Sequence, residues 1–205
     1  EGMIGYGYTG GKNIDMSSFL DINDQFGYSV SLNGNRLAVG AKNDDGRDNN
    51  CGDCGAVYLF NFSDAAFNGG TLTSRIGYLY NGAKDYSMSG IISSNDYFGA
   101  AVSLDATRLA VGAIGDDGNA NVLSDSGAVY LFTFADTAFT TPTLQARIGY
   151  GYTGGKNINL STLDANDQYG TSVSVNGRRL AVGAINDDGS GNTSSNTGAV
   201  YLYRF

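Results

Sequence analysis

One sequence pattern occurs three times along the chain, and it constrains the fold more than any other feature. The copies read FGYSVSLNGNRLAVGA at Phe26–Ala41, FGAAVSLDATRLAVGA at Phe98–Ala113 and YGTSVSVNGRRLAVGA at Tyr169–Ala184, and each is followed after a polar loop by GAVYLF or GAVYLY. An Ile-Gly-Tyr element recurs at Ile4, Ile76 and Ile148, at a spacing of 72 residues. Such periods are typical of repeat architectures. We therefore expect a single repeat domain over residues 1–205, with repeat 1 at about 1–74, repeat 2 at about 75–146 and repeat 3 at about 147–205.

The composition favours strands and turns over helices. The chain has 31 Gly, one Pro and 19 Asp against a single Glu. Asp, Asn, Gly and Ser are typical of turns, whereas helices favour Glu, Lys, Ala and Leu. We therefore predict an all-β protein.

Each repeat contains four predicted strands. In the first copy Tyr28, Val30 and Leu32 alternate with serines, which indicates a half-buried strand. Asn33-Gly34 then predicts a hairpin turn before the return strand at 36–41. Two further strands are expected at 56–60 and near 72–80. Four antiparallel strands per repeat predict the blade of a β-propeller.

The order of the strands predicts how the ring closes. The chain begins within a fourth strand at Met3–Tyr8 and ends on a third strand at Ala199–Arg204, so the N-terminal strand can complete the last blade. Three readings stay open: a three-bladed closure, a ring assembled from two chains, or a piece of a longer array. The start at Glu1, without an initiator Met, is itself expected of a processed or excised product.

The Phe26-Gly27 and Gly40-Ala41 pairs, followed by GAVYLF, resemble the FG-GAP repeats of the integrin alpha-chain head and their bacterial relatives. The resemblance covers essentially the whole chain. It implies four-stranded propeller blades, an extracellular or cell-surface setting, and a role in adhesion or ligand binding.

The chain departs from that family at two places. Lys42, Ile114 and Ile185 stand where the family has the Pro of Gly-Ala-Pro. The family's Asp-x-Asp-x-Asp-Gly calcium loop between the first two strands is missing, because that turn is only Asn33-Gly34-Asn35 and its copies. The family's usual calcium ligands therefore cannot be assigned here.

Acidic residues gather at another place. The loop before the first strand and the loop between the second and third strands should share one face, which then carries 16 of the 20 acidic residues. Calcium prefers several oxygen ligands of this kind. The candidate ligands are Asp24, Asp44 and Asp45, with their copies Asp96, Asp116, Asp117, Asp167, Asp187 and Asp188. The alternative is that these residues serve only as turn formers that keep a Gly-rich surface soluble.

The two cysteines lie in one loop, as Cys51-Gly52-Asp53-Cys54. Zinc needs four ligands, and a chain with no His and no other Cys cannot supply them. The pair also lies between strands and not at a helix start, where redox-active pairs are found. A local disulfide formed in an oxidising compartment is the favoured interpretation.

Several function classes are disfavoured by composition. A net charge of −8 repels phosphate backbones, so we do not expect nucleic acid as a partner. No stretch approaches the ~20 apolar residues of a membrane-spanning helix, so we do not expect membrane insertion. The absence of His removes the usual general base, so we do not expect an enzyme. A two-carboxylate glycosidase is formally possible but requires an asymmetry that three repeats do not offer.

Two functions remain in competition. The first is an extracellular structural or adhesive module that assembles with itself, head to tail or by strand exchange through Met3–Tyr8. The second is a multivalent lectin-like propeller whose partner is a cell-surface ligand or glycan. In that case Tyr6, Tyr8 and their copies would stack on sugars, whereas in the first case part of this tyrosine set is core.

Overall fold

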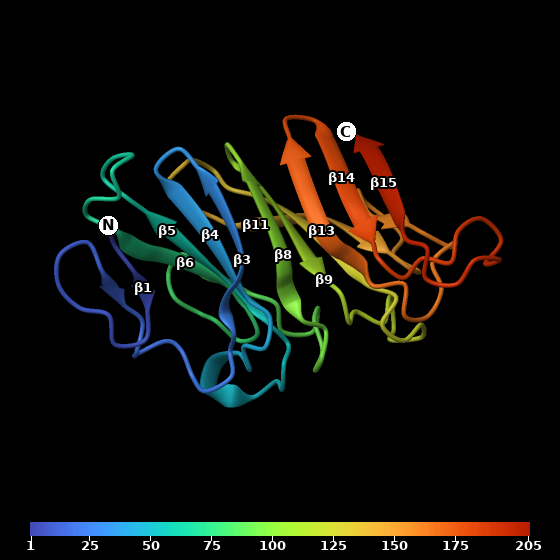
Figure 1. Cartoon of the computed structure of the whole chain (residues 1–205), viewed down its shortest axis with the longest axis horizontal. Helices are drawn as coiled ribbons and strands as arrows, with labels where there is room; N and C mark the ends of the chain where they lie inside the picture. Colours follow the sequence, from blue (N-terminus) through green and yellow to red (C-terminus); the bar gives the residue numbers. More distant parts are fainter.

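The computed structural model describes residues 1–205 and is all-β. Its one helical element is a short 3-10 turn at Arg47–Asn49. No helix has the length and apolar character that crossing a membrane requires. Most of the strands form three mainly antiparallel sheets, one for each sequence repeat, which lie side by side in a row (Figure 1), and a fourth sheet is a short parallel pair near the N-terminus.

The first sheet contains the strands of the first repeat in sequence order. These are β3 (Phe26–Asn33), β4 (Arg36–Ala41), β5 (Ala56–Asn61) and β6 (Thr71–Gly77), followed by the two-residue β7 (Tyr86–Ser87). The first four strands pair antiparallel, and β7 pairs parallel to β6. The four long strands lie where the sequence predicts strands, but β7 was not predicted, and the sheet therefore has five strands instead of the predicted four.

The second sheet repeats this order, and the third repeats only part of it. The second sheet comprises β8 (Phe98–Asp105), β9 (Arg108–Ala113), β10 (Ala128–Thr133), β11 (Thr143–Gly149) and β12 (Ile158–Asn159). The third sheet comprises β13 (Tyr169–Asn176), β14 (Arg179–Ala184) and β15 (Ala199–Arg204). The remaining pair, β1 (Ile4–Gly5) and β2 (Ile14–Asp15), forms a separate parallel ladder.

Glycines bring consecutive sheets into close contact. A Cβ atom on Gly40 would lie 2.0 Å from the carbonyl oxygen of Gly99, and one on Gly112 would lie 2.0 Å from that of Gly170. Gly99 and Gly170 themselves have φ angles of 93° and 95°, which other residues rarely adopt. The Phe-Gly pair of one repeat therefore fits against the Gly-Ala pair of the repeat before it.

Apolar side chains fill the spaces between the sheets. Val57 and Leu59 of β5 pack with Phe98 and Val102 of the second sheet in the largest buried cluster. Val129 of β10 packs in the same way with the third sheet. In a third cluster Met16 of the N-terminal segment packs on Tyr58, Phe60 and their neighbours in the first sheet. The N-terminal segment thus covers the first sheet as β6 and β7 cover the second.

The predicted closure by the N-terminal strand is not present in the structure. β1 pairs with β2 alone, and β15 is an edge strand that pairs with β14 on one side and with no strand on the other. The two strands lie at opposite ends of the row (Figure 1). β1 also spans only Ile4–Gly5, whereas the sequence predicted a strand over Met3–Tyr8. The reason is that residues 1–16 pack on the first sheet, which holds β1 away from the third.

Candidate functional site

The two acidic loops predicted to share a face do meet in every repeat. The backbone amide of Asn43 donates to the Asp24 carbonyl at 3.2 Å, and Gly115 donates to Asp96 at 3.1 Å. In the third repeat Asn186 donates to Asp167 at 3.3 Å. Each repeat therefore brings its predicted Asp residues into one loop pair.

Asp44 is the most buried acidic residue of the first loop pair, with an exposed fraction of 2 %. Its carboxylate accepts hydrogen bonds from the Tyr58 hydroxyl at 2.6 Å and from the Tyr80 hydroxyl at 2.7 and 2.9 Å. The backbone amide of Gly46 donates to it at 2.8 Å. Tyr58 therefore comes from β5, and Tyr80 comes from the residues just after β6.

Asp116 repeats this arrangement in the second loop pair. Tyr152 donates to its two carboxylate oxygens at 2.8 and 2.9 Å, and Tyr130 donates to Oδ2. The Gly118 amide donates at 2.8 Å. We call this arrangement, one buried Asp with two tyrosine hydroxyls and one glycine amide, the Asp–Tyr–Tyr site.

The third repeat has only half of an Asp–Tyr–Tyr site. Asp187 accepts from the Tyr201 hydroxyl at 2.5 Å and from the Gly189 amide at 2.8 Å, but no second tyrosine reaches it. In its place is an open pocket of about 440 Å³, which Asp187, Gly189, Ala199 and Tyr201 help to line. By the 72-residue spacing the missing tyrosine corresponds to Tyr8, whose side chain is 43 % exposed at the other end of the row.

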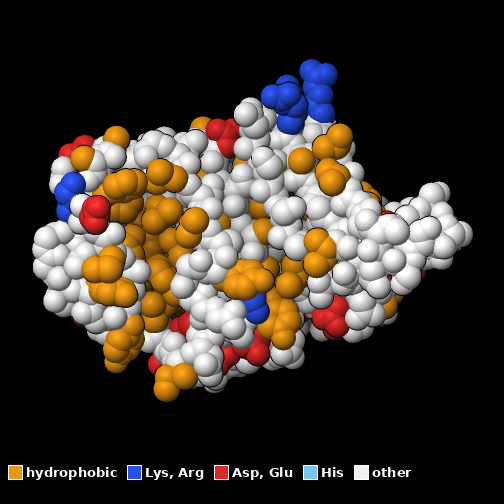
Figure 2. Space-filling view, in the orientation of Figure 1, with side chains coloured by type: hydrophobic (Ala, Val, Ile, Leu, Met, Phe, Trp, Pro, Cys, Tyr) orange, Lys and Arg blue, Asp and Glu red, His pale blue; other side chains and the backbone are white.

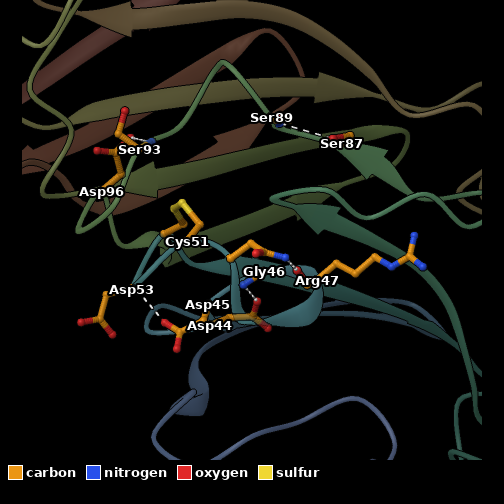
Figure 3. Close-up of a disulfide and its surroundings, with 12 residues drawn as sticks. Asp44, Asp45, Gly46, Arg47, Cys51, Asp53, Ser87, Ser89, Ser93 and Asp96 are labelled. Atoms are coloured by element: carbon orange, nitrogen blue, oxygen red, sulfur yellow. Dashed lines mark hydrogen bonds between the residues drawn. A yellow bond between two sulfur atoms is a disulfide. The ribbon is translucent and has the colours of Figure 1, made fainter.

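The other predicted carboxylates hold the loop itself. Asp45 Oδ1 accepts from the Asp53 amide at 2.7 Å, and Asp117 Oδ1 accepts from the Asp125 amide at 2.7 Å. Asp188 accepts from the Asn196 amide at 2.5 Å. Figure 3 shows Asp44 and Asp45 making separate contacts within one loop. No three acidic or Cys side chains come together in a group that could hold a metal ion.

The first loop also contains a disulfide between Cys51 and Cys54 (Figure 3). Both residues are buried and belong to the largest apolar cluster, between the first and second sheets. The Cys54 carbonyl accepts from the Phe98 amide at 2.8 Å, and Ser126 accepts from Tyr169 in the same way without a disulfide. The loop thus forms part of the contact between sheets in both repeats.

A profile of the FG-GAP repeat matches the chain three times, at residues 21–60, 92–132 and 161–203. Together these segments cover more than half of the sequence. The chain belongs to the FG-GAP repeat family. No curated protein matches it at a significant level.

Burial sets the electrostatics of these FG-GAP repeats. It raises the pKa of Asp24 to about 7 and that of Asp96 to about 8, and neighbouring carboxylates add to both shifts. Burial also raises the pKa of Asp44 and Asp116, although the tyrosine hydroxyls that donate to them oppose the change. The pKa values of those tyrosines lie far above their ordinary value, because burial disfavours the phenolate. The hydroxyls are therefore neutral donors.

The two ends of the row expose faces that the middle buries. On β3, Tyr28, Val30 and Leu32 are 53, 63 and 53 % exposed, whereas their copies on β8 are buried. On β15, Val200 and Leu202 are 70 and 78 % exposed, whereas Val57 and Leu59 are fully buried. Figure 2 shows hydrophobic side chains gathered toward the N-terminal end of the row. Both faces correspond in sequence to the surfaces that join sheets within the chain.

Proposed function

We propose that the protein is an extracellular, non-catalytic adhesive or structural module that associates with itself through the two ends of its row of sheets. Repeats of this family generally occur in extracellular adhesion and ligand-binding modules. The observation that carries the proposal is the complementarity of the two open faces. One open face is the side of β3 that is equivalent to the side through which β8 contacts the first sheet. The other is the side of β15 that is equivalent to the side through which β5 and β10 contact the next sheet.

Within this proposal the three sheets are consecutive blades of a β-propeller, and two chains complete one ring. Each chain contributes three sheets, so the pair has about six blades, within the usual range of about four to eight. Each third sheet then gains its fourth strand from the partner's N-terminal segment. Both open faces are buried in the pair, since a head-to-tail contact made twice around a two-fold axis closes.

Sedimentation velocity across about a hundredfold range of concentration tests this association. We expect a species of twice the 21.4 kDa chain mass that dissociates on dilution. A sedimenting species whose mass keeps rising with concentration would indicate an open row of chains and not a closed pair. A monomer at every concentration would overturn self-association.

Exposed tyrosines favour a second candidate function, glycan binding. Tyr6 is 71 % exposed and lies near the same end as Tyr28, which is 53 % exposed. Aromatic rings of this kind can stack on sugar faces. A glycan array read with the wild type and with Tyr6→Ala would show specific, ring-dependent binding if this function holds, and no signal above background if it does not.

Calcium is a further proposal for the acidic loops, with Asp24, Asp44 and Asp45 or their copies as ligands. The supporting observation is that each repeat brings two acidic loops together through a backbone hydrogen bond. These carboxylates already accept hydrogen bonds, so an ion would have to displace some of the donors. A rise in Tm between excess chelator and about millimolar calcium supports the site, and an unchanged Tm counts against it.

A further inference from the structure

We infer that the incomplete Asp–Tyr–Tyr site at Asp187 is the receptor for Tyr8 of a second copy of this chain. The inference rests on the proposed self-association and names the residues that would mediate it. Its basis is that the protein contains the finished contact twice, at Asp44 and at Asp116. The third copy of the site keeps the aspartate, the first tyrosine and the glycine amide, and it lacks the second tyrosine.

The missing side chain has a defined place. Tyr80 and Tyr152 follow Gly77 and Gly149 by three residues, and Tyr8 follows Gly5 by three residues. In the two complete sites that glycine lies opposite an alanine, Ala56 or Ala128, in the ladder between the third and fourth strands. The corresponding partners are Gly5 and Ala199. Pairing them places Tyr8 at the pocket beside Tyr201.

A backbone contact supports the same register. The amides of Arg47 and Asn119 donate to the carbonyls of Tyr78 and Tyr150, both at 2.9 Å. The equivalent donor in the third repeat is Ser190, and the equivalent acceptor is Tyr6 of the second copy. The glycine before each donor is closely covered in the complete sites, since a Cβ on Gly46 or Gly118 would lie 2.7 Å from Tyr78 or Tyr150 atoms. Gly189 has no such neighbour.

The face beside the pocket fits a second copy as well. A Cβ on Gly40 or Gly112 would meet a carbonyl of the next sheet at 2.0 Å, whereas at Gly183 it would meet only the Ser172 side chain within 3.5 Å. Gly183 therefore leaves room for the carbonyl of Gly27, the copy of Gly99 and Gly170. This continuity with two interfaces already formed in the chain identifies a second copy as the occupant.

The first test compares two tyrosine variants in sedimentation equilibrium. Tyr8→Phe removes the hydroxyl that would donate to Asp187, and we expect association at least about 10-fold weaker. Tyr6→Phe is the matched control. It keeps the backbone carbonyl assigned to Ser190, and the side chains of its copies Tyr78 and Tyr150 are only partly buried and donate no hydrogen bond to Asp44 or Asp116. We expect that control to stay within about twofold of the wild type. Equal association constants for the wild type and Tyr8→Phe would overturn the inference.

The second test fixes the register by cross-linking. Cβ atoms on Gly77 and Gly149 would lie 3.0 and 3.1 Å from those of Ala56 and Ala128, close enough for a disulfide with small adjustments. Gly5→Cys chains mixed with Ala199→Cys chains should therefore oxidise to a product of twice the chain mass. The native cysteines are already paired, so the background is low. Each variant oxidised alone is the control for random coupling.

The outcomes separate this inference from the proposed function. Association of the wild type without a cross-link in the mixture overturns the Tyr8 contact and leaves self-association standing. A monomeric wild type without any cross-link overturns both. If the Gly5→Cys, Ala199→Cys double variant forms its new disulfide only within single chains, the strand beside Ala199 is the chain's own N-terminal strand. The inference that a second copy occupies the site would then be wrong.

Discussion

At the scale of residues, hydrogen bonds from two tyrosine hydroxyls and a glycine amide hold the buried carboxylate in each complete acidic loop. The Asp pairs were predicted to gather on one face, and their loops do meet. The tyrosines that bind Asp44 were missed, because Tyr58 lies inside GAVYLF, where the pattern indicates only a buried strand. A usable signal was present: each complete repeat combines the Asp-Asp-Gly loop with a tyrosine three residues after the Ile-Gly pair. Sequence spacing could not show that these groups converge in space.

The buried carboxylates predict a stability that falls as pH rises. The pKa of Asp96 is about 8 in the folded protein and 3.8 without burial, so the folded state binds more protons between these values. Its contribution is greatest below about pH 4 and is lost as pH rises through 8, at up to about 1.4 kcal/mol per pH unit. No histidine titrates in this window.

Thermal unfolding between pH 5 and 8 measures this effect. We expect Tm to fall with pH in the wild type and to fall less steeply in Asp96→Asn, whose amide can still accept from Ser93. Asp136→Asn is the control, because Asp136 is exposed and its pKa is lowered instead. Parallel curves of Tm against pH for the wild type and Asp96→Asn would show that the titration of Asp96 does not cause the fall in Tm.

At the scale of elements, the strands could be predicted and their short parallel neighbours could not. Alternation and the Asn33-Gly34 turn gave β3 and β4 with close to the observed bounds. The two-residue strands β2, β7 and β12 have no period that a sequence reading can detect. Closure of the ring within one chain, one of the three predicted alternatives, is not present in this structure, because strand order does not determine where the N-terminal segment packs.

The glycines between sheets predict different costs for one substitution at two equivalent positions. Gly112→Ala places a Cβ against the Gly170 backbone, so we expect the free energy of unfolding to fall by about 1–3 kcal/mol. Gly183→Ala meets only the exposed Ser172 side chain, which can turn away, and should change stability by less than about 0.5 kcal/mol.

Urea unfolding of both variants measures the difference. Sedimentation of Gly183→Ala adds a second readout, because its methyl group would block a neighbouring sheet and weaken self-association. Equal stabilities for Gly112→Ala and Gly183→Ala would show that the close contact at Gly112 is not a constraint.

At the scale of the whole molecule, charge acts against the association that we propose. The acidic loops of all three repeats lie on one face, and Lys and Arg side chains project at the opposite side, over the β13–β14 turn (Figure 2). Had two molecules stacked acidic face on basic face, low salt would strengthen the contact. A row that continues sheet by sheet instead places acidic loops beside acidic loops.

Salt should therefore strengthen the association of chains that each carry a net charge of −8. We expect the dissociation constant measured by sedimentation to fall between about 50 and 500 mM NaCl. A dissociation constant that rises with salt would favour stacking of opposite faces over extension of the row.

The backbone contacts at Gly40 and Gly112 have a consequence for how such a protein can change over evolutionary time. Carbonyl oxygens and glycine Cα atoms are the same in every repeat, so this part of the contact between sheets does not depend on the other side chains. Each sheet also contacts only its neighbours along the row. A gene of this kind can gain or lose whole repeats, and loops such as the one with Cys51 and Cys54 can diversify, while the joints between units stay unchanged.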